Sequence, residues 1–81
     1  MPHFNWTLIQ TFLAVVEHGS FSAAGRALSI SQPTVGRHIQ DLEKQLDSVL
    51  FARETRGHQL TDAGLSLVEH AQDMQAAAAH L

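Results

Sequence analysis

The clearest helical pattern in the chain lies in residues 29–46, SISQPTVGRHIQDLEKQL. Four apolar residues in it recur at intervals of four, three and four positions: Val35, Ile39, Leu42 and Leu46. That spacing places them on one side of a helix, which therefore has a single apolar face. Ser31 is placed to cap the helix, and Pro33 falls in its first turn, where the missing N–H of proline costs little. The pattern predicts an amphipathic helix from Ser31 to Leu46.

The side of this helix opposite the apolar face is polar or small, at Pro33, Gly36, Arg37, Gln40 and Lys44. Free N–H groups and the positive end of the helix dipole at Ser31 suit a phosphate. Arginine and glutamine pair with guanine and adenine in the major groove of DNA, and Arg37 and Gln32 are candidates for this role. A plain cap at Ser31 and a solvated Arg37 are the alternatives. The pattern predicts a DNA-contacting surface made of Ser31, Gln32, Pro33, Thr34, Arg37 and His38.

A first helix is predicted upstream, over residues 6–18. Its apolar residues recur at helical spacing, at Trp6, Ile9, Phe12, Leu13 and Val16. The start is open between a cap at Asn5 and a capping box that begins at Thr7. Gly19 is suited to the left-handed conformation that ends helices, so the helix is expected to stop there.

A short second helix is predicted to begin after a cap at Ser20. We expect its inner face to consist of Phe21, Ala24, Ala27 and Leu28. Only Ser29 and Ile30 separate it from the helix that Ser31 caps. Two helices joined by so short a link form a helix-turn-helix, in which the second helix enters the major groove of DNA.

A two-stranded hairpin is predicted after this motif. Its strands are the short runs 49–53 and 58–61, and the turn 54–57 is polar and ends in Gly57. A hairpin in this position is a wing. Arg53 and Arg56 are candidates to contact the DNA backbone or minor groove, with an ion pair to a neighbouring carboxylate as the alternative for Arg53.

A long helix capped by Thr61 is predicted to run to the end of the chain. Residues at intervals of four, three, four and three form a heptad-like seam: Leu67, Ala71, Met74, Ala78 and Leu81. Small residues in the seam allow a second helix to approach closely. We expect a homodimer through this seam, with packing on the first helix of the same chain as the alternative.

Composition excludes several classes of protein. The chain has 81 residues and no cysteine, which excludes disulfides and cysteine-ligated zinc. Its six histidines are never within five residues of one another, so no helical pair of metal ligands is present. No glycine-flanked serine nucleophile and no glycine-rich phosphate loop is found. We expect no catalysis, no metal and no cofactor.

The net charge of −3 by itself argues against a nucleic-acid partner, but the acids are unevenly placed. Residues 61–81 contain three acidic residues and no lysine or arginine, whereas residues 1–40 contain two arginines and one glutamate. A small basic surface upstream of the tail therefore remains. The alternative function is a winged-helix protein-interaction or dimerisation module without DNA binding.

The order of elements predicts a mainly α fold: a winged helix-turn-helix with three helices and a two-stranded wing over residues 1–60, then a linker or dimerisation helix over residues 61–81. The motifs also resemble the N-terminal DNA-binding domain of LysR-type transcriptional regulators over about residues 5–81. The resemblance lies in Gly19-Ser20-Phe21, Ala23-Ala24, Ser31-Gln32-Pro33, Arg37, Ile39 to Glu43, Leu50-Phe51 and Leu60 to Gly64.

The resemblance implies a bacterial, cytoplasmic, nucleoid-associated protein that binds double-stranded DNA with an imperfect inverted repeat. Regulators of this family are dimers or tetramers that dimerise through the helix after the wing. They sense a small effector through a C-terminal domain that this chain does not include. One departure is Gly36, where the family often has serine; it implies either a closer approach of the backbone to DNA or a neutral change at an exposed site.

Overall fold

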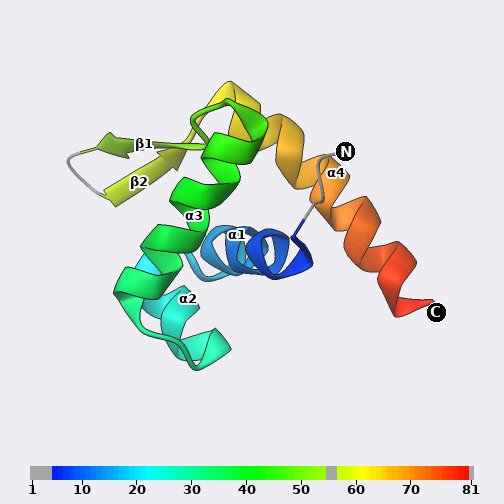
Figure 1. Ribbon diagram of the computed structural model, residues 1–81, viewed down its shortest axis with the longest axis horizontal. Helices are drawn as coiled ribbons and strands as arrows, with labels where there is room; N and C mark the ends of the chain where they lie inside the picture. The colour runs from blue at the N-terminus through cyan, green and yellow to red at the C-terminus, as the bar shows by residue number, and fades with distance from the viewer. Residues whose placement is uncertain (1–4, 55–56, 81) are drawn as a thin grey trace. The chain divides into compact units, whose positions relative to one another are not determined.

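A computed structural model describes residues 5–54 and 57–80 of the chain (Figure 1). Its elements are α1 (Trp6–His18), α2 (Phe21–Leu28), α3 (Gln32–Leu46), β1 (Phe51–Glu54), β2 (Gly57–Leu60) and α4 (Asp62–Ala79). The predicted class, mainly helical with one two-stranded sheet, is confirmed. The chain divides into two compact units, Met1–Ser48 and Val49–Leu81, while the division proposed at residue 60 stays a prediction.

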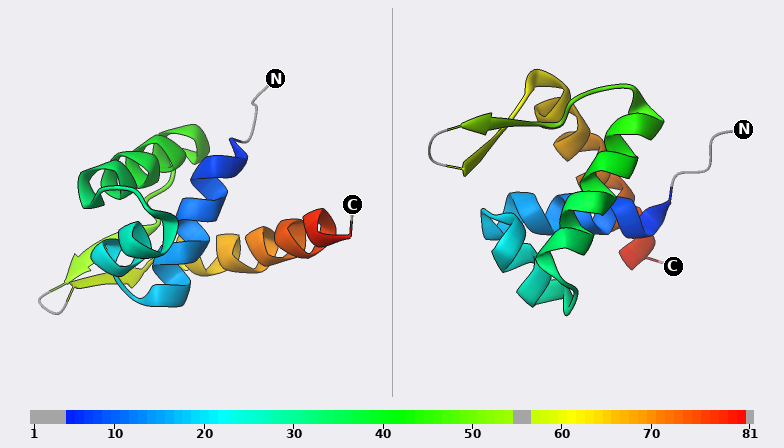
Figure 2. Two further views of the ribbon diagram at one scale, coloured as in Figure 1. Left: turned by 90° about the horizontal axis from the view of Figure 1, so that it is seen from below. Right: turned by 60° about the vertical axis from the view of Figure 1, so that its left-hand side comes forward.

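In the first unit, α1 forms the centre of the core. Its N-cap is Asn5, whose Oδ1 accepts from the backbone N–H of Thr7 at 2.9 Å, and Gly19 ends it at φ 85° as predicted. The side chains of Ile9 and Phe12 have no exposed surface. Both α2 and α3 pack on α1, and α3 runs across it (Figures 1 and 2). Burial on several sides explains the unbroken apolar run 12–16 in α1.

The α2 helix and the turn after it correct one prediction. Ala27 and Leu28 were expected to face inward, but both are exposed, and Gly25 is buried instead. The chain reverses at Ser29, in the left-handed conformation with φ 60°, and returns directly over Gly25. A Cβ atom at Gly25 would lie 2.8 Å from the carbonyl oxygen of Ile30. The tight turn therefore requires glycine at this position, because any side chain would meet the returning backbone.

The α3 helix has the predicted apolar face. Of its four predicted residues, Val35, Ile39 and Leu42 are buried, and Leu46 is half-buried. The predicted cap is also present, because Ser31 Oγ accepts from the backbone N–H of Thr34 at 3.2 Å. Burying three branched aliphatic side chains stabilises the fold by about 1.5–3 kcal/mol each and holds α3 against the rest of its unit.

In the second unit, β1 and β2 pair antiparallel, with Phe51 opposite Leu60 and Arg53 opposite His58. Thr61 joins the hairpin to α4. Its backbone N–H donates to the carbonyl of Leu50 at 3.0 Å, and its hydroxyl donates to the carbonyl of Val49.

The same hydroxyl of Thr61 accepts from the N–H of Gly64 at 3.1 Å and so caps α4, as predicted. The hairpin and the first turn of α4 are thereby linked through one side chain. Among the described residues, no helix is long and apolar enough to cross a membrane.

Candidate nucleic-acid interface

An exposed strip begins at the N-terminal end of α3 and runs along the side of the helix away from its buried face. Ser31, Gln32, Pro33 and Arg37 are all exposed, and the strip continues toward the C-terminus with Gln40 and Lys44. The same helix buries Val35 and Ile39 completely or nearly so, at 0% and 3% exposure. The strip therefore faces solvent because the opposite side is anchored in the core. Four of the six residues predicted from this segment lie on it.

A small hydrogen-bond network occupies the start of α3. Ser31 Oγ lies 2.8 Å from Thr34 Oγ1 and accepts the N–H of Thr34. Thr34 is half-buried, so its hydroxyl is directed to the cap as much as to solvent. The first-turn N–H groups of a helix have no partner further back in the helix and suit an anion. The predicted capping role of Ser31 is confirmed, and a phosphate contact there stays a prediction.

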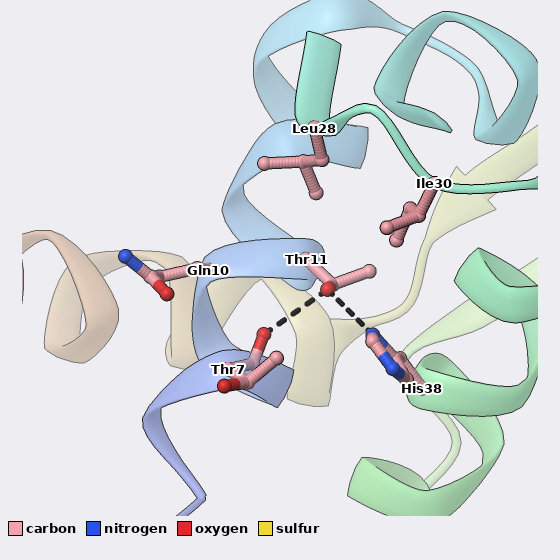
Figure 3. Close-up of a pocket in the computed structure, with 6 residues that line it drawn as sticks. All are labelled: Thr7, Gln10, Thr11, Leu28, Ile30 and His38. Atoms are coloured by element: carbon pink, nitrogen blue, oxygen red, sulfur yellow. Dashed lines mark hydrogen bonds between the residues drawn. The ribbon is translucent and has the colours of Figure 1, made fainter. Parts of the chain in front are cut away.

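His38 differs from its neighbours on α3. Its Nδ1 lies 2.8 Å from Thr11 Oγ1, and the ring is half-buried (Figure 3). Thr11 is only 1% exposed and belongs to the face of α1 that packs in the core. The structure thus gives His38 a partner within its own unit rather than the free position expected of a DNA-contacting side chain. The signal in the sequence was a polar Thr11 directly before the apolar run Phe12–Val16.

A cavity of about 190 Å³ opens beside this pair. It is lined by Thr7, Gln10, Thr11, Leu28, Ile30 and His38 (Figure 3). These residues come from α1, from the end of α2 and its turn, and from α3. The cavity therefore lies where the helix-turn-helix rests on α1.

The wing is described only in part. Arg53 is exposed on β1, with His58 opposite it on β2. Arg56, the other predicted contact, lies outside the described residues. On α2, Arg26 donates from Nη1 to Ser22 Oγ at 2.9 Å, which orients one further exposed cation.

The predicted seam of α4 is not uniform. Leu67 and Met74 are half-buried, Ala78 is exposed, and Leu81 lies outside the described residues. Ala71 has no exposed surface. Ala71 is therefore not accessible to a second copy, and dimerisation through the seam stays a prediction. In the part of the chain that the structure describes, no three histidine or carboxylate side chains are grouped to hold a metal ion.

Comparison with known proteins identifies the family. The model of the bacterial regulatory helix-turn-helix proteins of the lysR family matches residues 6–65. The transcriptional regulator ClcR of Pseudomonas putida is 49% identical over 63 residues, covering 78% of this chain and 21% of ClcR. TfdS of Cupriavidus pinatubonensis is 47% identical over 66 residues, covering 82% of this chain and 22% of TfdS. The chain thus spans about a fifth of the length of these relatives.

Solved structures agree with the sequence relatives. The crystal structure of a CbnR_DBD–DNA complex matches with a TM-score of 0.89 at 36% identity, over 95% of this chain and 88% of that one. A BenM_DBD/catB site 1 DNA complex matches with a TM-score of 0.90 at 31% identity, over 95% of this chain and 86% of that one. The helices, the wing and the motifs at the cap of α3 are those of a winged helix-turn-helix, and the chain belongs to the LysR family of bacterial regulatory helix-turn-helix proteins.

Proposed function

We propose that this chain binds double-stranded DNA as the DNA-binding part of a transcriptional regulator, with α3 in the major groove. The observation that carries the proposal is the exposed strip of α3, which holds Gln32 and Arg37 within two turns of the helix N-terminus. Amide and guanidinium groups read adenine and guanine edges by paired hydrogen bonds. The cap at Ser31 offers a phosphate-binding terminus beside them.

Local charge supports DNA over a purely protein partner. The segment Gln32–Gln40 of α3 contains Arg37 and no acidic residue, although the whole chain carries a charge of −3. Asp62, Glu69 and Asp73 all lie on α4. DNA affinity depends on the charges that meet phosphates, so acids on another helix weaken binding without preventing it. Arg53 on the wing adds a second cation for the DNA backbone.

The named relatives support the same function. The matching structures of CbnR_DBD and BenM_DBD are complexes with DNA, and the curated relatives are named transcriptional regulators. By analogy the chain acts in the bacterial cytoplasm, on the nucleoid, and its role is recognition rather than catalysis. In a longer regulator, an effector would act through a domain outside this chain.

A homodimer through α4 belongs to the proposal. The helix has 18 residues, about 27 Å at 1.5 Å per residue, and Leu67 and Met74 lie along it as partly exposed apolar side chains. A two-fold axis through such a contact presents two copies of α3 to two half-sites. The preferred duplex is then an imperfect inverted repeat.

Selection of duplexes from a random library, followed by salt titration, tests the proposal. The selected duplex should be bound about 10³-fold or more tightly than a scrambled one. The logarithm of its affinity should fall linearly with the logarithm of the salt concentration, because binding releases counterions. A protein-interaction module predicts no enrichment and no salt-dependent binding, and that result would overturn the DNA-binding role.

A further inference from the structure

The buried hydroxyl of Thr11 determines which nitrogen of His38 carries a proton. A threonine hydroxyl has a single hydrogen, and that of Thr11 is donated to the carbonyl of Thr7 at 3.0 Å. With that hydrogen directed to Thr7, the 2.8 Å contact with His38 uses a lone pair of Thr11 Oγ1. Nδ1 of His38 is then the donor. The tautomer of a histidine ring is set by such a partner, and here it is the Nδ1–H form.

We infer that His38 is a positioning residue: its Nδ1–H, donated to Thr11, fixes the rotation of α3 against α1 and so the aim of Arg37. This inference rests on the DNA-binding role proposed above. His38 and Arg37 are consecutive on α3, so their side chains leave the helix about 100° apart. With the ring of His38 tied to α1, Arg37 is exposed on the outer side.

Beside His38, the packing of α3 is incomplete on one side. The cavity of about 190 Å³ borders both Thr11 and His38, and Leu28 and Ile30 lie on its other walls (Figure 3). Protein interiors normally resist motion because side chains fill the space, and here that constraint is missing on one side. The hydrogen bond is directional, so it fixes the rotation of α3 in a way that apolar contacts do not. Base readout needs a fixed rotation, because functional groups must be held to within about 0.5 Å of their working geometry.

The buried position of Thr11 makes the bond selective for one arrangement. Thr11 is 1% exposed, and the cavity beside it is wide enough for water. Rolling α3 away would exchange the bond to the fixed donor of His38 for one to a mobile water, which does not fix the rotation of the helix. A valine at this position has nearly the same shape as threonine but cannot accept a hydrogen bond from His38. Thr11→Val therefore removes the directional contact while leaving the volume in place.

Nitrogen-detected NMR of the histidine rings, without DNA, tests the pair directly. At a pH where the ring is neutral, His38 should carry its proton on Nδ1 and a lone pair on Nε2. Thr11→Val should remove this bias, and Thr11→Ser should keep it. A wild-type ring protonated on Nε2 when neutral would overturn the inference whether or not the chain binds DNA.

Binding to the selected and scrambled duplexes tests the consequence. Thr11→Val should lower affinity for the selected duplex by about three- to tenfold, as expected for one hydrogen bond. Affinity for the scrambled duplex should stay within about twofold, and Thr11→Ser should behave as wild type. Equal losses on both duplexes, or none, would overturn the positioning role.

A double variant separates positioning from simple destabilisation. His38→Phe keeps a ring but has no donor, so adding it to Thr11→Val should cause no further loss of discrimination. Additive losses would show that the two residues act separately and would contradict the inference. If wild type shows no preference between the duplexes, the DNA-binding proposal fails, and the NMR result still decides whether the pair exists.

Discussion

Gly64 lies in the first turn of α4, where the structure leaves no room for a methyl group. A Cβ atom there would collide with the carbonyl oxygen of Leu50 and would lie 2.8 Å from Cδ2 of Leu60. The side chain of Leu60 has rotatable bonds and can move away. The carbonyl of Leu50 cannot, because it accepts the N–H of Thr61 at 3.0 Å and helps fix the end of the wing. We therefore expect Gly64→Ala to destabilise the protein.

Two opposing terms set the size of this effect. Inserting a methyl group where backbone must shift costs about 1–3 kcal/mol. Alanine is favoured over glycine by about 1 kcal/mol in a helix interior, and less at Gly64, which is only the third residue of α4. The net loss is about 1–2 kcal/mol of unfolding free energy. In a domain of this size it lowers the midpoint of thermal unfolding by about 5–15 °C.

Gly36 provides a matched control, because it is also a helical glycine and the substitution is the same. A Cβ atom at Gly36 meets only Cδ2 of Phe21, at an ordinary 4.0 Å. Gly36→Ala should therefore gain helix propensity without a clash and raise the midpoint by about 3–8 °C. Thermal unfolding followed by far-ultraviolet circular dichroism, at one protein concentration, measures both variants. The reasoning is refuted if Gly64→Ala is as stable as wild type or if both variants shift in the same direction.

Three further predictions concern binding. Arg37→Ala should cost about 1–3 kcal/mol of binding free energy on the selected duplex and relax the base preference at one base pair per half-site. Lys44→Ala removes a charge further along α3 and should leave the base preference unchanged. A competition assay with single-base variants of the duplex measures both, and equal losses on all duplexes would exclude base reading by Arg37. Arg53→Ala should weaken binding to all duplexes alike and reduce the slope of log affinity against log salt by about one per protomer, and an unchanged slope would remove the wing strand from the phosphates. Met74→Glu should weaken both the dimer and DNA binding, because a charge buried between two helices would lose its water without gaining a partner. An unchanged mass in sedimentation together with an unchanged DNA affinity would exclude the seam as the dimer interface.

The helices and their boundaries follow from local patterns in the sequence. Asn5, Ser20, Ser31 and Thr61 were each expected to cap a helix, and each accepts a backbone N–H in the structure. Capping needs only a side-chain oxygen within three residues of its donor, so it can be predicted from the chain alone. The buried face of α3 was predictable for a similar reason. A helix with one buried face carries the whole apolar pattern of that face within one continuous segment of sequence.

Contacts between segments were less predictable. The inward position of Gly25 depends on the return path of the chain after Ser29, and helical periodicity contains no information about that path. The pairing of His38 with Thr11 joins residues 27 positions apart. Before the fold is known, the spacing of His38 and Arg37 along α3 favours a DNA contact for both. Only the crossing of α3 over α1 distinguishes the surroundings of the two side chains, because it buries part of His38 and leaves Arg37 exposed.

The double use of the Thr61 hydroxyl has a consequence for how the wing finds its register. Short two-stranded hairpins are marginal alone and tolerate slippage, because a shifted ladder keeps most of its backbone bonds. Here a slip of β2 by one residue would carry Thr61 away from the carbonyls of Val49 and Leu50, whereas its cap on Gly64 is local and would move with it. A misaligned wing therefore loses the two hydrogen bonds of Thr61 as well as its own pairing. The residue that starts α4 thus also favours the correct alignment of the strands before it.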